Sequence, residues 1–181
     1  MKFNKLPKDF FQRRADVVAK ELLGKILVRK INGKKIRAKI VETEAYFGEE
    51  DPASRACKNG DLKETMQMKP GIILVYGVHN NWLINFVTDR EKEASAVLIR
   101  ALQPLNFNNN CSGPGLLTKS MKINKDFHKK DLINNKKLWV EESDSNNRNF
   151  GIIETSRIGI KKDLPQKLRF YIKDNKHVSR K

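Results

Sequence analysis

The sequence predicts an α+β fold: a single mixed domain over residues 1–181, with helices flanking a mostly antiparallel sheet built from hairpins. One observation is the pair Asn32-Gly33, which separates two apolar runs within residues 25–46. This dipeptide is a strong signal for a two-residue hairpin turn. Another is a second pair of apolar runs over residues 71–88, which predicts a second hairpin.

The remaining strands and one helix follow from shorter patterns. The second hairpin has its predicted tip at residues 79–81, and the apolar stretch ASAVLIRAL over residues 94–102 predicts a further strand. A helix is expected within residues 112–123, because Pro114 suits a first helical turn. The Asn-rich residues 124–149 are expected to hold only short elements. Two closing strands are predicted at RIGI, residues 157–160, and LRFYI, residues 168–172.

A helix is also predicted over residues 15–25. Asp16 is a suitable N-cap residue, and Val18 and Leu22 lie four residues apart on one helical face. Gly24 is a typical helix stop.

The charge balance points to a polyanionic partner. The chain has 37 Lys and Arg against 21 Asp and Glu, a formal net charge of +16. Such an excess favours nucleic acid or an anionic membrane surface, although a lysine-rich surface selected for solubility is the alternative. No run of about 18 apolar residues occurs and the N-terminus lacks a secretory signal pattern, so we expect an intracellular protein.

Metal and disulfide chemistry are not indicated. Cys57 and Cys111 are expected to be free thiols in a reducing compartment. Neither cysteine has a metal-binding spacing, and His79, His128 and His177 are far apart in the sequence.

Acidic residues continue an apolar strand pattern in IVETEAYFGEED, residues 40–51. Counting alternate positions from Ile36 through Ile40 places Glu42, Glu44 and Tyr46 on the same, buried face, provided that no bulge intervenes. Buried carboxylates are costly unless they are paired or used in chemistry.

Arg100 is the one charged residue within an apolar strand, and Glu42 or Glu44 is its natural partner. A purely structural ion pair would explain this pattern. A carboxylate oriented by an arginine at a pocket would also suit a general base.

Two other functions fit parts of the pattern. Glu42, Glu44 and Asp51 could hold Mg²⁺ in a nuclease. A non-enzymatic, basic nucleic-acid-binding protein would explain the charge but not the acids and the arginine in apolar strands. Tyr46 and Tyr76 are candidates for stacking on a base, although tyrosines of this kind often pack in a core.

Several ordered motifs resemble the alkyladenine (3-methyladenine) DNA glycosylases, the family that includes human alkyladenine glycosylase. They run in family order from about residue 16 to the C-terminus: AKELLGKILV, IVETEAYFGEEDPAS, MKPGIILVYG, NWLINFVT, AVLIRALQPL, GPGLLTKSMKI and RIGIKKDLPQKLRFYIKDNKHVSRK. The resemblance implies a single mixed domain around a curved antiparallel sheet.

The resemblance also implies site roles. Glu44 would be the general base that activates water, and Arg100 would help to hold that water. Tyr46 and Tyr76 would enclose a base flipped out of the duplex, and Asn85 would line the pocket and help to exclude guanine. Glu42 would then be structural.

Two positions depart from the family pattern. Arg55 stands where the family usually has a histidine against the flipped base, so it either turns away to a phosphate or changes the substrate range. The tip between Tyr76 and Asn85 is about one residue shorter and has no tyrosine to fill the vacated stack. Val78, or otherwise His79, would intercalate there.

The implied enzyme is a monofunctional DNA-3-methyladenine glycosylase of base excision repair, acting without metal or cofactor. Its substrate would be double-stranded DNA with alkylated or deaminated purines. The resemblance and the chain's length suggest a prokaryote-like monomer in the cytoplasm, associated with the nucleoid.

Overall fold

The predicted first hairpin is present in the computed structural model, which describes residues 4–143 and 149–180. Strands β1 (Ile26–Ile31) and β2 (Lys34–Tyr46) pair antiparallel, with Ile31 opposite Lys34. Asn32 and Gly33 form the two-residue turn, and both have left-handed φ angles of 47° and 81°. These angles are those of the turn type that matches strand twist.

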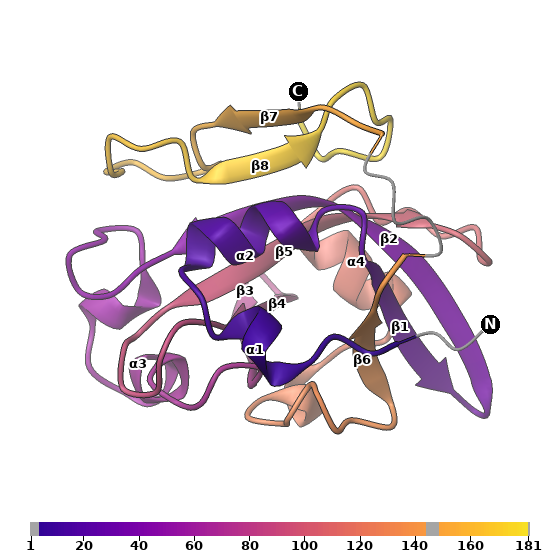
Figure 1. Cartoon of the computed structure of the whole chain (residues 1–181), viewed down its shortest axis with the longest axis horizontal. Helices are drawn as coiled ribbons and strands as arrows, with labels where there is room; N and C mark the ends of the chain where they lie inside the picture. The colour runs from indigo at the N-terminus through magenta and orange to yellow at the C-terminus, as the bar shows by residue number, and fades with distance from the viewer. Residues whose placement is uncertain (1–3, 144–148, 181) are drawn as a thin grey trace.

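Strand β2 is the centre of an eight-stranded antiparallel sheet (Figure 1). Along one edge it pairs with β5 (Ala96–Pro104); along the other it pairs first with β1 and then with β8 (Arg169–Ile172). The strand order is β3-β4-β5-β2-β1-β6, with β6 at Leu138–Glu141, and β7 (Ile152–Thr155) pairs with β8. The predicted α+β class with a hairpin-built antiparallel sheet is confirmed.

The second hairpin joins β3 (Ile73–Val78) to β4 (Asn81–Val87). His79 and Asn80 form its turn with φ angles of 45° and 60°. The predicted tip is therefore confirmed.

Helix α2 (Ala15–Leu22) packs on the sheet beside β2 (Figure 1), where the Thr43 hydroxyl donates a hydrogen bond to the Ala19 carbonyl at 2.8 Å. The predicted N-cap at Asp16 is wrong, because the helix already begins at Ala15 and the Asp16 carboxylate pairs with the Arg14 guanidinium instead. The predicted stop is confirmed by the φ of +87° at Gly24. The other helices are α1 (Lys8–Phe11), η1 (Arg55–Cys57), α3 (Asp61–Met66), α4 (Pro114–Ser120) and η2 (Lys125–Phe127). No helix in the described ranges is long and apolar enough to cross a membrane.

The predicted strand at residues 157–160 is wrong, whereas the one at LRFYI is confirmed as β8. Residues 158–159 form a turn, with Gly159 at φ +74°. The N–H of Ile158 donates to the Glu44 carboxylate rather than to a neighbouring strand. A hydrogen bond to a side chain thus takes the place of the backbone hydrogen bonds that a strand would form.

The expected phase along β2 is also wrong. Ile40 and Val41 are adjacent, yet both are buried in the main core, and the pairing with β5 is irregular from Ile40 to Thr43. Such a bulge reverses the alternation of faces. Beyond it, Thr43 and Ala45 face α2, so Glu42, Glu44 and Tyr46 lie on the opposite face. The predicted burial of both carboxylates is nevertheless confirmed, since each is 0% exposed.

Candidate active site

Two carboxylates and an arginine form the buried centre of the site. Arg100 on β5 donates from Nε to Glu42 at 3.1 Å and from Nη1 to Glu44 at 3.3 Å. The sequence suggested one of these partners, and the structure shows both. Such pairing is what makes two carboxylates tolerable in an interior.

Glu42 is saturated by its neighbours. Besides Arg100, it accepts hydrogen bonds from Arg169 Nε at 2.7 Å, from the Ser179 N–H at 2.7 Å and from Ser179 Oγ at 2.9 Å. The carboxylate therefore has little capacity left for a reacting water, and its contacts are those of a structural group.

Glu44 has a different environment. Its Oε1 accepts from the Ile158 N–H at 2.8 Å, and its Oε2 accepts from the Tyr46 hydroxyl at 2.7 Å and from Arg100. Burial raises the pKa of Glu44, while Arg100, the Ile158 N–H and Tyr46 act in the opposite direction. A carboxylate with a raised pKa is a stronger base once ionised, which suits proton abstraction.

Tyr46 is locked between the carboxylate and an arginine that the sequence analysis missed. The Arg157 guanidinium lies 4.5 Å from the centre of the Tyr46 ring. It forms two bonds of 2.7 Å to Asp51 and also pairs with Asp163. Burial alone would lower the pKa of Arg157, but these two aspartates outweigh it and raise that pKa. The guanidinium is therefore fixed as a cation.

Arg157 was missed because its segment was interpreted as a strand. Its partner Asp51 lies more than a hundred residues away in the chain, so sequence spacing carries no signal for the pair. Burial raises the pKa of Tyr46 well above its usual range, as does the neighbouring Glu44. The phenol thus stays protonated as a donor.

The four residues predicted for the base pocket line one small cavity. Tyr46, Tyr76, Asn85 and Arg55 surround it. Asn85 on β4 is 2% exposed, and its amide N–H donates to a carbonyl of β3 at 3.3 Å. Apolar side chains complete the lining, namely Met66, Leu74 and Ala96.

The Arg55 guanidinium lies over the Tyr76 ring, 4.8 Å from its centre. Arg55 itself is an exposed residue at the start of η1. The cavity between these groups holds about 10 Å³, which is room for about one water.

Val78 and His79, predicted to intercalate, lie at the end of the β3–β4 hairpin. Val78 is half-buried, and His79 is exposed in the turn. Because side chains alternate along a strand, Val78 shares a face of β3 with Tyr76. Trp82 pairs with Gly77 in the same hairpin and is 37% exposed, so it is an aromatic candidate for DNA contact that the sequence analysis did not single out.

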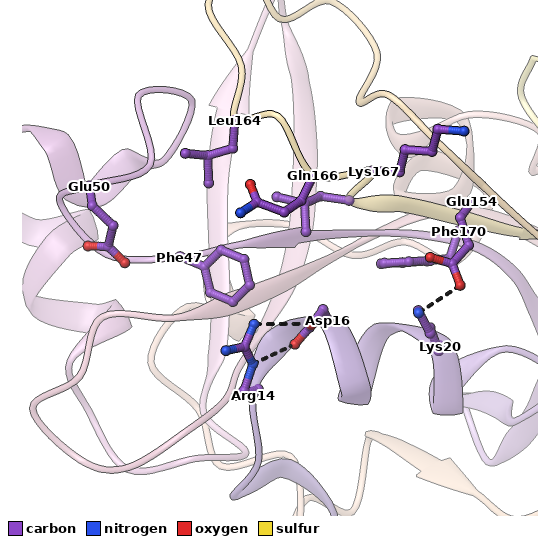
Figure 2. Close-up of a pocket in the computed structure, with 11 residues that line it drawn as sticks. Arg14, Asp16, Lys20, Phe47, Glu50, Glu154, Leu164, Gln166, Lys167 and Phe170 are labelled. Atoms are coloured by element: carbon purple, nitrogen blue, oxygen red, sulfur yellow. Dashed lines mark hydrogen bonds and ion pairs between the residues drawn. The ribbon is translucent and has the colours of Figure 1, made fainter.

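A roomier groove lies between α2 and the C-terminal strands (Figure 2). Its volume is about 440 Å³, but it contains none of the predicted site residues. Two of its cations are already paired, Arg14 with Asp16 at 3.1 Å and Lys20 with Glu154 at 2.7 Å (Figure 2).

The acidic residues do not converge as a magnesium site would require. Asp51 faces Arg157, whereas Glu42 and Glu44 face Arg100. Within residues 4–143 and 149–180, no group of three or more His, Cys, Asp or Glu side chains is arranged to hold a metal ion. This donor arrangement does not fit the nuclease alternative.

Comparison with known proteins identifies the family of the chain. Residues 9–176 match the model of the family described as "Methylpurine-DNA glycosylase (MPG)". The chain belongs to the methylpurine-DNA glycosylase family. A relative from Aeropyrum pernix is 41% identical, covering 97% of this chain and 93% of the relative. A relative from Clostridium botulinum strain Hall is also 41% identical, covering 97% and 98%. Both are named "Putative 3-methyladenine DNA glycosylase".

Membership in the methylpurine-DNA glycosylase family confirms the family and the enzyme class that the motifs predicted. The individual roles of Glu44, Arg100 and the pocket residues stay predictions, which the geometry makes specific enough to test.

Proposed function

We propose that this protein is a monofunctional DNA glycosylase that removes alkylated purines from duplex DNA and leaves an abasic site. One observation carries the proposal: the buried carboxylate of Glu44 is bonded to the hydroxyl of Tyr46, a ring that lines the same cavity as Tyr76. A candidate base and a candidate stacking platform are thereby joined at one place.

The substrate base would leave the helix before reacting. A purine inside a duplex cannot be reached, so the nucleotide is extruded into the pocket. N3- or N7-alkylation makes the purine cationic, and a cation is attracted to the faces of tyrosine rings. Tyr46 and Tyr76 would hold the base, while Asn85 lies at the cavity wall to read its edge.

The chemical step would be direct hydrolysis. Glu44 takes a proton from a water whose oxygen bonds to the sugar C1′, and the C1′–N bond breaks as the base leaves. Arg100 orients Glu44 and the water. One carboxylate with a water between it and the sugar carbon follows the inverting logic of glycoside hydrolysis. No lysine is among the described residues that line the cavity, and we expect the enzyme to release the base without cutting the strand.

The partner would be double-stranded DNA, bound by a monomer in the cytoplasm or at the nucleoid. The net charge of +16 would hold the flanking phosphates. Binding through phosphates releases counterions, so the affinity should fall steeply as salt rises.

The proposal is tested by base release in EDTA from duplexes with 3-methyladenine or 1,N6-ethenoadenine. Wild type should release the base, and strand breaks should appear only after alkali. Glu44→Gln should lose release by a factor of at least about 100, the scale of a general base. Glu49→Gln is the matched control, because Glu49 belongs to the same acidic stretch but is exposed.

Three outcomes would contradict the proposal. EDTA-sensitive strand cutting would indicate a nuclease, and cutting without alkali in EDTA would indicate a lyase. DNA binding without release of any lesion would indicate a binding protein.

A further inference from the structure

The side chain of Arg55 fills the place where a base would stack. Its guanidinium covers the Tyr76 ring at 4.8 Å and lines the cavity, which retains only about 10 Å³. A purine does not fit beside it. We propose that the Arg55 side chain occupies the cavity meant for the flipped base, here called the base slot, and that an entering base displaces it. We propose further that Arg55 shifts substrate preference from cationic towards neutral purines. This inference rests on the proposed function.

Two arginines lie over the two tyrosines, but only Arg55 can be displaced. Arg157 lies over Tyr46 without lining the cavity, so it covers the ring outside the slot. Its bonds to Asp51 and Asp163 fix it, and its side chain is 0% exposed. A base entering the slot therefore leaves Arg157 in place.

Arg55 has no comparable anchor. No carboxylate in the described ranges forms an ion pair with it, and the Tyr76 ring is its contact. Its backbone is nonetheless fixed, since the Ser54 hydroxyl caps η1 by accepting from the Ala56 N–H at 3.1 Å. The Arg55 side chain can thus rotate while its backbone stays in place. An exposed cation–π contact is weak, and a flanking phosphate offers a charge-assisted alternative.

The fixed backbone of Arg55 has a consequence for the choice of substrate. A displaced Arg55 stays beside the slot and repels a cationic base. A neutral purine with O6 and N7 acceptors, such as hypoxanthine, can instead accept hydrogen bonds from the guanidinium. Displacing Arg55 from Tyr76 is a cost common to all bases, so the charge of the base decides the difference between them.

The experiment compares kcat/KM for 3-methyladenine and for hypoxanthine in matched duplexes. Arg55→Ala should raise the ratio of 3-methyladenine to hypoxanthine by about three- to tenfold, the scale of one partly screened charge at close range. Lys58→Ala is the control, because Lys58 is an exposed cation three residues further along the same segment. It should leave the ratio unchanged.

A second experiment tests whether the Arg55 side chain lies over the Tyr76 ring in solution. In the NMR spectrum of the unbound protein, the Arg55 side-chain protons should be shifted upfield by the Tyr76 ring. The shift should disappear when Glu44→Gln protein binds a duplex with 1,N6-ethenoadenine. Absence of the shift in the unbound protein, or its persistence on DNA, would overturn the inference.

The kinetic outcomes separate the two proposals. If wild type releases bases but Arg55→Ala leaves the ratio unchanged or lowers it, the present inference fails and the glycosylase stands. If no variant releases either base, the glycosylase proposal fails, and this inference fails with it.

Discussion

The hydroxyl of Tyr46 lies 2.7 Å from Oε2 of Glu44. The two residues are two positions apart on β2 and share a face. One hydrogen bond therefore couples the ring expected to hold the base to the carboxylate expected to activate water. The backbone places both groups together by strand geometry alone.

This bond gives a prediction for pH dependence. Glu44 acts as a base only when ionised, so the rate of base release should fall as pH drops through its pKa. Because burial raises that pKa, the acidic limb should lie above 4.5, the ordinary value. Tyr46→Phe keeps the ring but removes a hydrogen bond that lowers this pKa, so its limb should lie at still higher pH.

Single-turnover rates between pH 4 and 8 would check this. Tyr76→Phe is the control, since no hydrogen bond from Tyr76 to Glu44 is present. A limb that does not move in Tyr46→Phe would show that the bond does not tune the base.

A second prediction concerns the buried pair of Arg157 and Asp51, in which both side chains are 0% exposed. Arg157→Ala leaves a buried aspartate without its partner and should lower the free energy of unfolding by about 3–5 kcal/mol. Lys20→Ala breaks the exposed pair with Glu154 and should cost at most about 1 kcal/mol. Urea unfolding monitored by tryptophan fluorescence measures both values. Equal losses would argue against a special role for burial.

A third prediction treats Glu42 as a positioning residue for Arg100. Glu42→Ala should lower kcat by about 10- to 100-fold, since small misplacements of reacting groups cost that much. KM should change little, because Glu42 does not line the base cavity. Glu42→Gln keeps one oxygen, which at the Oε1 position can still accept from Arg100 and Arg169, and it should recover part of the rate. Glu50→Ala, at an exposed position, serves as the control.

A rise in KM with unchanged kcat for Glu42→Ala would instead place this residue in substrate binding.

A fourth prediction distinguishes the candidates for intercalation at the hairpin tip. Val78→Ala should reduce base release from duplex DNA several-fold while sparing a single-stranded substrate, because an apolar wedge is needed only to fill a vacated stack. His79→Ala should have a smaller effect. The fluorescence of 2-aminopurine beside the lesion would report unstacking directly. The reverse order of effects would assign the wedge to His79.

Local patterns predicted most of the sheet. Asn32-Gly33 and His79-Asn80 form two-residue turns in the structure. Such turns need left-handed φ angles that few residue types tolerate, so the dipeptide itself indicates the turn. Ile158 was wrongly placed in a strand, because its N–H bonds to a side chain more than a hundred residues away.

The site was predicted less completely for a related reason. Glu44 and Arg100 stood out because charges interrupt apolar strands. The bulge after Ile40 was not visible, since the irregular pairing depends on the fit between β2 and β5. Arg157 was placed in a predicted strand, and nothing in that pattern pointed to its partner Asp51, more than a hundred residues away in the chain.

The contacts of Glu42 join residues that are synthesised far apart in time. Glu42 leaves the ribosome 137 residues before Ser179, whose N–H and hydroxyl it binds. At typical synthesis rates that interval is about 7–30 s. The chain from β1 to β5 is made first, while Glu42 still lacks Arg169 and Ser179 and Asp51 still lacks Arg157. A nascent chain that ends before Ser179 therefore lacks two of the hydrogen bonds that hold Glu42, and we expect such a chain not to release bases.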